Sequence, residues 1–176
     1  MAIFIGGAIF AVHLFNFYFP LKYTDIIEKH AASYNLDPVL VASIINVESR
    51  FRHGAVSHAG ASGLMQLMPG TANWVAQEVG IADFYFNDMI FEPHINIQLG
   101  SWYLRRLIDN HSTLPVALAA YNAGSGNVAS WLDNPDFSSN GTTLDYIPFG
   151  ETRRYVDRVQ LNIHAYRFRF WLTRIL

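Results

Sequence analysis

The chain has 176 residues, of which 51% are hydrophobic, 15% aromatic and 15% charged, and its formal net charge is -2. This length fits one domain, and so apolar a composition excludes intrinsic disorder. The charge leaves no basic excess for nucleic acid, and the absence of cysteine excludes disulfides, thiolate chemistry and Cys-ligated metals.

Residues 1–21 contain no charged side chain and form an apolar segment up to Pro20. A membrane span needs ~18–20 residues, and this segment has that length. Since no basic n-region or small-residue cleavage site is visible, an uncleaved membrane anchor or signal-anchor is favoured over a cleaved signal peptide and over a buried helix. Lys22 and Lys29 follow this segment and no basic residue precedes it, so charge bias does not place the following domain outside. We expect an anchor at 1–21 and one domain at 22–176.

Beyond residue 21 the apolar residues recur at helical spacing without alternating runs, which predicts an all-α domain. Thr24 or Asp25 is expected to cap the first helix, Asp37 with Pro38 the second, and Thr71 a later one. The expected helices cover residues 26–34, 39–48, 72–79, 93–107, 114–121, 125–132 and 151 to about 170.

One carboxylate interrupts the apolar stripe of the helix over 39–48. Apolar residues occupy positions i, i+3 and i+4, and Glu48 follows at i+7 on the same face. The apolar positions are Val41, Ile44 and Ile45. Burial would raise the pKa of the Glu48 carboxyl, as a general acid near neutral pH requires. Alternatively, Glu48 ends the helix and pairs with Arg50 or Arg52 on a solvated face.

Four separated blocks of sequence follow one another in a recognisable order. They are Glu48-Ser49-Arg50-Phe51, Gly63-Leu64-Met65-Gln66, Ala119-Ala120-Tyr121-Asn122-Ala123-Gly124 and the stretch 146–156 with Glu151 and Tyr155. Together they resemble the catalytic domain of the soluble lytic murein transglycosylase family over about residues 23–164. The resemblance implies a single all-α domain with a lysozyme-like fold of the goose type.

The resemblance also implies a site. Glu48 matches the single catalytic acid of the family, Met65 and Gln66 match side chains that line the sugar cleft, and Tyr121 matches a tyrosine that hydrogen-bonds near the catalytic carboxyl. The implied substrate-binding residues are Ser57, Gly63, Leu64, Met65, Gln66, Tyr121, Asn122, Glu151 and Tyr155.

Some of these residues have a plain structural interpretation as well. Leu64, Met65 and Leu67 fit ordinary core packing. Tyr121 can plug a helix end, and Glu151 suits the first turn of a helix, where negative charge is favourable. Aromatic candidates for the cleft are Trp74, Tyr103, Trp131, Tyr146 and Phe149. The tail at 166–174 alternates aromatic and basic residues, so it either completes the last helix against the domain or touches an anionic membrane.

The implied activity is that of a cell-wall lyase. It would cleave the bond between N-acetylmuramic acid and N-acetylglucosamine in peptidoglycan glycan strands and leave 1,6-anhydromuramic acid ends. A lysozyme-like hydrolase and a non-catalytic peptidoglycan-binding protein are the alternatives. Because murein lies outside the cytoplasmic membrane, we expect an extracytoplasmic, monomeric domain of the cell envelope, held by the N-terminal segment. No cofactor, metal or nucleic acid is expected, since the seven histidines show no His-Glu-x-x-His spacing.

Overall fold

The computed structural model describes residue 10 and residues 12–175. In this part of the chain helices form the architecture, and extended pairing is limited to isolated bridges of Ser62 with Val56 and with Leu67. The helices are α2 (Thr24–Ser33), α3 (Pro38–Ser49), α4 (Pro69–Glu78), α5 (Phe86–Met89), α6 (Pro93–Asn110), α7 (Leu114–Ala123), α8 (Ser125–Leu132) and α9 (Gly150–Ile175). The all-α prediction is confirmed for these residues, with the short α5 as an element that the sequence did not indicate.

Of the three predicted helix caps, one is confirmed and two are wrong. Asp37 caps α3, because its carboxylate accepts a hydrogen bond of 2.9 Å from the Val39 N–H. The prediction for Thr71 is wrong, since Pro69 already occupies the first turn of α4 and no side chain caps that helix. The prediction for Thr24 or Asp25 is also wrong, because α2 begins at Thr24 and its cap position is Tyr23, whose backbone is left-handed with φ 58° and whose side chain forms no cap hydrogen bond.

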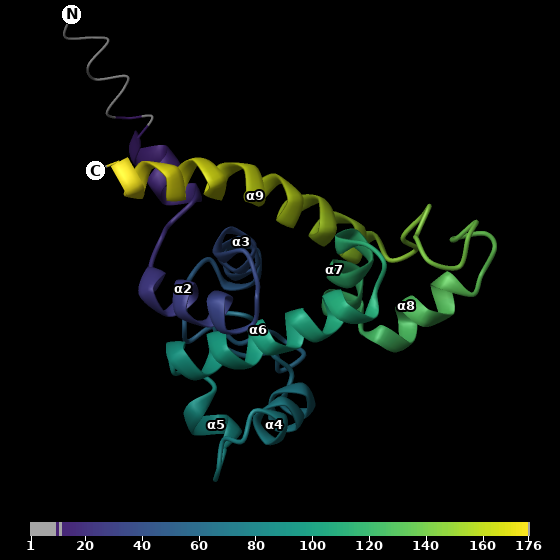
Figure 1. Ribbon diagram of the computed structural model, residues 1–176, viewed down its shortest axis with the longest axis horizontal. Helices are drawn as coiled ribbons and strands as arrows, with labels where there is room; N and C mark the ends of the chain where they lie inside the picture. The colour runs from purple at the N-terminus through teal and green to yellow at the C-terminus, as the bar shows by residue number, and fades with distance from the viewer. Residues whose placement is uncertain (1–9, 11, 176) are drawn as a thin grey trace, which may run out of the picture.

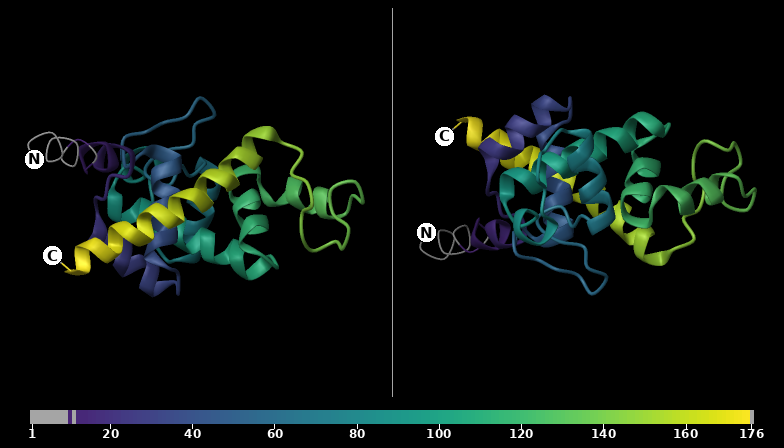
Figure 2. Two further views of the ribbon diagram at one scale, coloured as in Figure 1. Left: turned by 90° about the horizontal axis from the view of Figure 1, so that it is seen from above. Right: turned by 90° about the horizontal axis from the view of Figure 1, so that it is seen from below.

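Helix α3 forms the centre of the fold. Figure 1 shows α9 crossing over α3 and α7, while α6 runs beneath them and packs against α2, α4 and α7. The view from above, on the left of Figure 2, shows α9 running diagonally over the remaining helices. Val41, Ile44 and Ile45 of α3 are fully buried, and each such side chain stabilises the fold by about 1.5–3 kcal/mol. These three side chains face the interior, whereas Val47 and Glu48 in the last turn of α3 are half-buried.

A smaller cluster of buried residues joins α4 to α6. It contains Leu67, Ala72, Val75, Ala76, Ile90 and Leu99. Because the segment over 62–67 lies between this cluster and the larger core around α3, both of its sides are held by packing.

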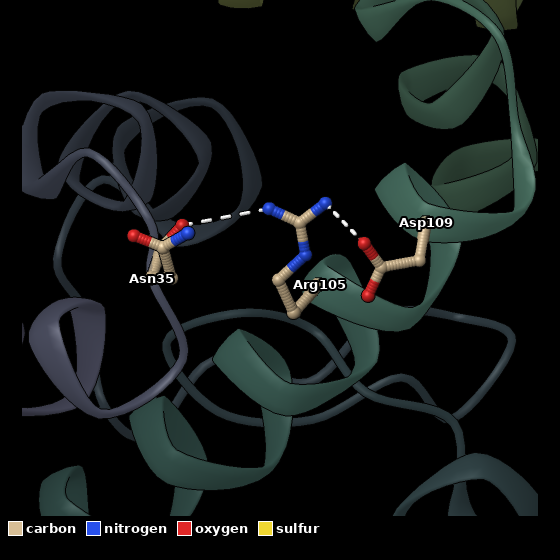
Figure 3. A network of polar contacts seen from close by, with 3 residues as sticks. All are labelled: Asn35, Arg105 and Asp109. Atoms are coloured by element: carbon tan, nitrogen blue, oxygen red, sulfur yellow. Dashed lines mark hydrogen bonds and ion pairs between the residues drawn. The ribbon is translucent and has the colours of Figure 1, made fainter.

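A side chain of α6 holds the turn between α2 and α3. The Arg105 guanidinium donates to the Asn35 carbonyl at 3.4 Å and to the Asp109 carboxylate at 2.5 Å, as Figure 3 shows. Asn35 has φ 51°, a left-handed conformation that asparagine tolerates better than most residues. An exposed pair one helical turn apart contributes only about 0.3–0.5 kcal/mol, so Arg105 mainly orients the turn.

The first described helical residues pack against the end of the last helix. Residues 12–18 are helical and lie beside the carboxyl end of α9 (Figure 1). Phe15 packs edge-on against Phe168 at 5.9 Å between ring centroids, and the buried Tyr166 donates its hydroxyl hydrogen to the Pro20 carbonyl at 2.6 Å. The interpretation that the tail completes the last helix against the domain is confirmed for Tyr166 and Phe170, which are buried, whereas Trp171 is exposed.

Ten of the 21 residues of the predicted anchor, 1–9 and 11, lie outside the described residues. Among the residues that the structure describes, none of the helices combines the length and apolar character that a bilayer crossing requires.

Candidate active site

Glu48 occupies the last turn of α3, and its environment makes its carboxyl unusual. The pKa of this carboxyl is raised from 4.5 to about 7, chiefly by burial; a polar interaction with Tyr155 and the charge of Arg158 oppose the rise, and the charge of Glu151 adds to it. The carboxyl end of a helix also disfavours negative charge. The expected raised pKa is confirmed. The alternative pairing of Glu48 with Arg50 or Arg52 is wrong, because the described part of the chain contains no such ion pair.

Two tyrosines from different helices flank Glu48. Tyr121 of α7 donates its hydroxyl hydrogen to the Met65 carbonyl at 2.9 Å, so it bridges α7 to the 62–67 segment and does not merely plug a helix end. Tyr155 of α9 is buried, and its hydroxyl interacts with the Glu48 carboxyl without reaching hydrogen-bond geometry, so no partner satisfies it. Burial, followed by the charge of Glu48, raises the pKa of both phenols well above the ordinary value. Both are neutral donors at physiological pH.

The segment beside Glu48 is tied down by two residues that sequence analysis did not assign to the site. The buried Ser49 hydroxyl contacts the carbonyls of Leu64 at 2.8 Å and Ile45 at 3.1 Å. Asn96 of α6 is fully buried; it accepts from the Met65 N–H at 2.7 Å and donates to the carbonyls of Ser62 at 3.1 Å and Ile90 at 2.9 Å. The available signal was an asparagine inside a helix, since asparagine is a poor helix former and needs local partners there.

Two glycines make room for this segment. A Cβ on Gly63, where φ is 82°, would lie 2.1 Å from the Asn96 amide nitrogen and 2.6 Å from the Ile90 carbonyl oxygen. A Cβ on Gly100 would lie 2.4 Å from the Met65 sulfur. Met65 therefore packs its side chain onto α6.

Core packing is confirmed for Leu64, Met65 and Leu67, whose side chains are all buried. The expectation that the Met65 side chain lines a cleft is wrong, because that side chain is enclosed between the segment and Gly100 of α6. What Met65 presents toward Tyr121 is its backbone carbonyl.

Gln66 and Ser57 belong to the loop that precedes α4. Gln66 has φ 48° and donates from its amide nitrogen to the carbonyls of Ala55 at 3.1 Å and Gly63 at 2.9 Å, which fixes the loop onto itself. The Ser57 hydroxyl accepts from the Ala61 N–H at 3.0 Å. The contacts of Ser57 thus close the loop and do not join this residue to Glu48.

Two adjacent cavities lie near the tyrosines. One of about 220 Å³ is lined by Gln66, Tyr103, Tyr121 and Asn122 among others. The second, of about 590 Å³, is lined by Asn122, Phe149 and Glu151 among others. Because both include Asn122, they form neighbouring parts of one depression; Glu48 is not among the lining residues of either. Such concave, partly aromatic surfaces suit sugar rings.

Asn122 is held by a residue of α9. Its side-chain oxygen accepts a hydrogen bond of 2.8 Å from the Thr152 hydroxyl in the first turn of α9. Glu151 lies in that same first turn and is exposed, as expected of a negative charge at the start of a helix. It also lines the larger cavity.

The aromatic candidates divide between the core and the surface. Tyr103 and Phe149 line the cavities, whereas Trp131 is buried and stacks edge-on against Phe149 at 4.9 Å. Trp74 and Tyr146 are exposed and line neither of the two cavities.

The structure therefore brings together most of the residues expected at the site. Those near Glu48 or the cavities are the Met65 carbonyl, Gln66, Tyr121, Asn122, Glu151 and Tyr155. Gly63 and Leu64 support the segment from within, and Ser57 stays in its loop.

Comparison with known proteins gives a consistent result. The family model described as "Transglycosylase SLT domain" matches residues 25–142. The soluble lytic murein transglycosylase of Salmonella typhimurium is 36% identical over 80% of this chain and 22% of its own length. Membrane-bound lytic murein transglycosylase C of Salmonella arizonae is 31% identical over 84% of this chain and 47% of its own length.

Solved structures show the same similarity. The 70 kDa soluble lytic transglycosylase of Escherichia coli superimposes with a TM-score of 0.76 and 31% identity over 86% of this chain and 25% of that protein. Its complex with bulgecin A gives a TM-score of 0.75, with 31% identity over 86% of this chain and 25% of the other. An inactive glutamate-to-glutamine mutant of Slt from Pseudomonas aeruginosa gives 0.73, with 32% identity over the same shares of the two chains. The chain thus spans about a quarter of the length of its soluble relatives.

Proposed function

The chain belongs to the transglycosylase SLT domain family, and on this basis we propose that it is a peptidoglycan lytic transglycosylase whose acid and base is Glu48. The observation that carries the proposal is the Glu48 carboxyl itself, with a pKa raised by burial to about 7. A carboxyl with that pKa is half protonated near neutral pH, so it can both give and take a proton. The inactive glutamate-to-glutamine mutant of the Pseudomonas aeruginosa relative supports a central role for one glutamate in the family.

The proposed reaction needs one carboxyl and no added water. Protonated Glu48 donates to the glycosidic oxygen, the bond from that oxygen to C1 of N-acetylmuramic acid breaks, and N-acetylglucosamine leaves with a free 4-hydroxyl. The acetamido oxygen of the muramic residue stabilises the positive C1. Ionised Glu48 then takes the proton of the muramic O6 hydroxyl as O6 bonds to C1, which closes a 1,6-anhydro ring and restores the acid. Because the nucleophile belongs to the substrate, its effective concentration is high.

Two tyrosines have distinct parts in this scheme. The unpartnered Tyr155 hydroxyl is available to hydrogen-bond the Glu48 carboxylate that forms after proton transfer. Tyr121, fixed on the Met65 carbonyl, positions a wall of the sugar site. Gln66, Asn122 and the remaining residues of the two cavities would contact the glycan.

A lysozyme-like hydrolase is the second candidate, and one observation favours it. Glu151 is a second carboxylate whose charge acts on the Glu48 pKa, and it lines the larger cavity. Inverting hydrolysis requires a second carboxylate to activate water. Under the proposed mechanism Glu151 has no chemical step, so replacement of Glu151 by glutamine separates the two candidates.

The whole chain is proposed to work on murein from the outer side of the cytoplasmic membrane, with residues 1–21 as its anchor and residues 22–176 as the catalytic domain. The apolar, uncharged sequence of residues 1–21 supports the anchor. We propose a monomer that needs no metal or cofactor.

The decisive experiment is mass spectrometry of muropeptides released from purified peptidoglycan by the full chain. Glu48→Gln is the test variant, and Glu28→Gln on the exposed face of α2 is the matched control. Products with 1,6-anhydromuramic ends from the wild type and the control, and none from Glu48→Gln, support the proposal. Reducing ends that disappear in Glu151→Gln establish hydrolysis, and full release by Glu48→Gln refutes the assignment of the acid.

A further inference from the structure

A cavity of about 190 Å³ lies where residues 17–19 meet α3 and α9, behind the carboxyl end of the helix that carries Glu48. Its lining residues are Phe17, Tyr18, Phe19, Asn46, Val47, Arg50, Arg158 and Asn162. The cavity shares no lining residue with the two cavities beside Tyr121. It therefore requires an explanation other than the glycan site.

Two cationic side chains line this cavity, and no carboxylate is among its lining residues. In the described part of the chain, the Arg50 side chain forms no ion pair or hydrogen bond, and the Arg158 side chain donates only to the Val47 carbonyl at 3.5 Å. Two guanidinium groups on one small cavity repel each other unless an anion lies between them. The planar fork of donors on arginine fits the oxygens of phosphate or carboxylate.

A buried acceptor adds a second requirement. Asn46 is only 7% exposed, and its amide nitrogen donates to the Tyr18 carbonyl at 3.1 Å and to the Asn162 side-chain oxygen at 2.7 Å. Its own side-chain oxygen is buried and has no donor. A buried acceptor without a partner is rare and costly. A fitting ligand would thus be anionic toward the arginines and would offer a hydroxyl hydrogen toward Asn46.

We propose that this cavity binds the phosphate of a hydroxyl-bearing phosphate compound, with Arg50 and Arg158 on the phosphate oxygens and Asn46 accepting from the hydroxyl. A glycerol phosphate unit has this chemistry, either free in solution or as a lipid headgroup. The exposed fractions of Phe17 and Tyr18, 70% and 57%, place apolar surface at the rim, as a headgroup at a membrane surface requires.

Occupancy of this cavity is coupled to the acid, and only this part rests on the proposed function. Arg158 lines the cavity and also lowers the pKa of Glu48 through its charge. The other groups that act on Glu48 are Tyr155 and Glu151 of α9, and its charge in turn reaches Tyr121 of α7. A bound anion offsets the charge of Arg158, so the carboxyl stays protonated to higher pH.

Binding is tested first without any activity readout. The full chain in neutral detergent is titrated with glycerol phosphate and with inorganic phosphate by ³¹P line broadening, and its binding to phosphatidylglycerol vesicles is compared with its binding to pure phosphatidylcholine vesicles. Arg50→Gln is the test variant. Arg106→Gln, which removes the same charge from an exposed position on α6, is the matched control. Circular dichroism and thermal melting establish that all variants are folded.

We expect Arg50→Gln to weaken phosphate binding about tenfold, as befits the loss of one charge-assisted contact, while Arg106→Gln matches the wild type. A preference for phosphatidylglycerol that is lost in Arg50→Gln identifies the headgroup as the source, and binding of the soluble phosphates alone identifies a free anion. Absence of phosphate binding by the wild type, or equal losses in the two variants, overturns the site.

The coupling is tested by the pH dependence of glycan cleavage. Saturating glycerol phosphate is expected to move the alkaline limb of wild-type activity to higher pH. Arg158→Gln should show that shift already without phosphate and no further shift with it. An alkaline limb that ignores phosphate while binding persists overturns the coupling and leaves the phosphate site standing. An inactive enzyme that still binds phosphate through Arg50 refutes the proposed function alone.

Discussion

Replacing Glu48 by glutamine should stabilise the protein above neutral pH and leave its stability nearly unchanged in acid. Glutamine has the shape of a protonated glutamate but cannot ionise. In the native state burial raises the pKa of Glu48 from 4.5 to about 7, so the native state holds its proton more tightly than the unfolded chain does. The stability that this protonation contributes is fully present below pH 4.5 and is lost as the pH rises through about 7.

The shift sets the size of the effect. One pKa unit corresponds to about 1.4 kcal/mol, so the shift of Glu48 amounts to about 3 kcal/mol between the two limits. Against a total stability of about 5–15 kcal/mol for a domain, this is a large share for one side chain. The wild type should therefore be less stable than Glu48→Gln by about 3 kcal/mol at pH 8 and by about zero near pH 4.

Urea denaturation of both proteins between pH 4 and pH 8 measures this difference directly. Other titrating groups cancel in the comparison, because they are the same in the two proteins. Glu28→Gln, an exposed glutamate on α2, serves as the control and should show no rising difference with pH. A constant difference between Glu48→Gln and the wild type over this range would refute the burial of an ionisable acid at the end of α3.

Three further substitutions test the surroundings of the site. Tyr155→Phe removes an interaction that lowers the pKa of Glu48, so the alkaline limb of the pH–activity profile should move upward, and an unchanged profile contradicts this role. Asn96→Leu leaves the Met65 N–H and the Ile90 carbonyl without these partners and removes one of the two hydrogen bonds to the Ser62 carbonyl. It should lower the free energy of unfolding in urea by about 3 kcal/mol, whereas a loss under about 1 would show that the 62–67 segment does not depend on Asn96. Burial lowers the pKa of His30 from 6.5 to about 4, so this residue alone should cost the protein up to about 2 kcal/mol, after discounting for solvent screening, as the pH falls through this range, opposite in sign to the contribution of Glu48. His30→Gln removes only the His30 contribution, so the wild type should lose stability relative to His30→Gln by that amount between pH 7 and pH 4, as urea titrations of both proteins would measure.

The position of the acid was predictable because it rests on a short-range pattern. The stripe of Val41, Ile44 and Ile45 is a property of one helix, and Glu48 lies on it whatever the rest of the chain does. The start of α3 was equally local, since Asp37 caps its own helix. These two patterns, each confined to α3, therefore carried over from the sequence to the structure.

Contacts between distant segments were not predictable in this way. Asn96 contacts Met65 across 31 positions of the chain, and no local pattern near either residue specifies that pair. The burial of the Met65 side chain follows from the absence of a Cβ on Gly100, another long-range relation. The predicted helix starts were wrong where a proline or a left-handed residue, and not the nearest polar side chain, set the first residue of the helix. Pro69 does so for α4.

Arg50 ends α3, two residues after Glu48, and also lines the cavity between residues 17–19, α3 and α9. Arg50 closes α3 with φ 52° and ψ 42°, a left-handed position where glycine is the preferred residue and a larger one costs about 1–2 kcal/mol. Within the described chain the Arg50 guanidinium forms no hydrogen bond or ion pair that would offset this cost. Arg50→Gly should therefore raise the free energy of unfolding in urea by about 1 kcal/mol while it weakens phosphate binding as Arg50→Gln does. If Arg50→Gly is instead destabilised, the guanidinium supports the fold itself, and its placement no longer argues for a ligand.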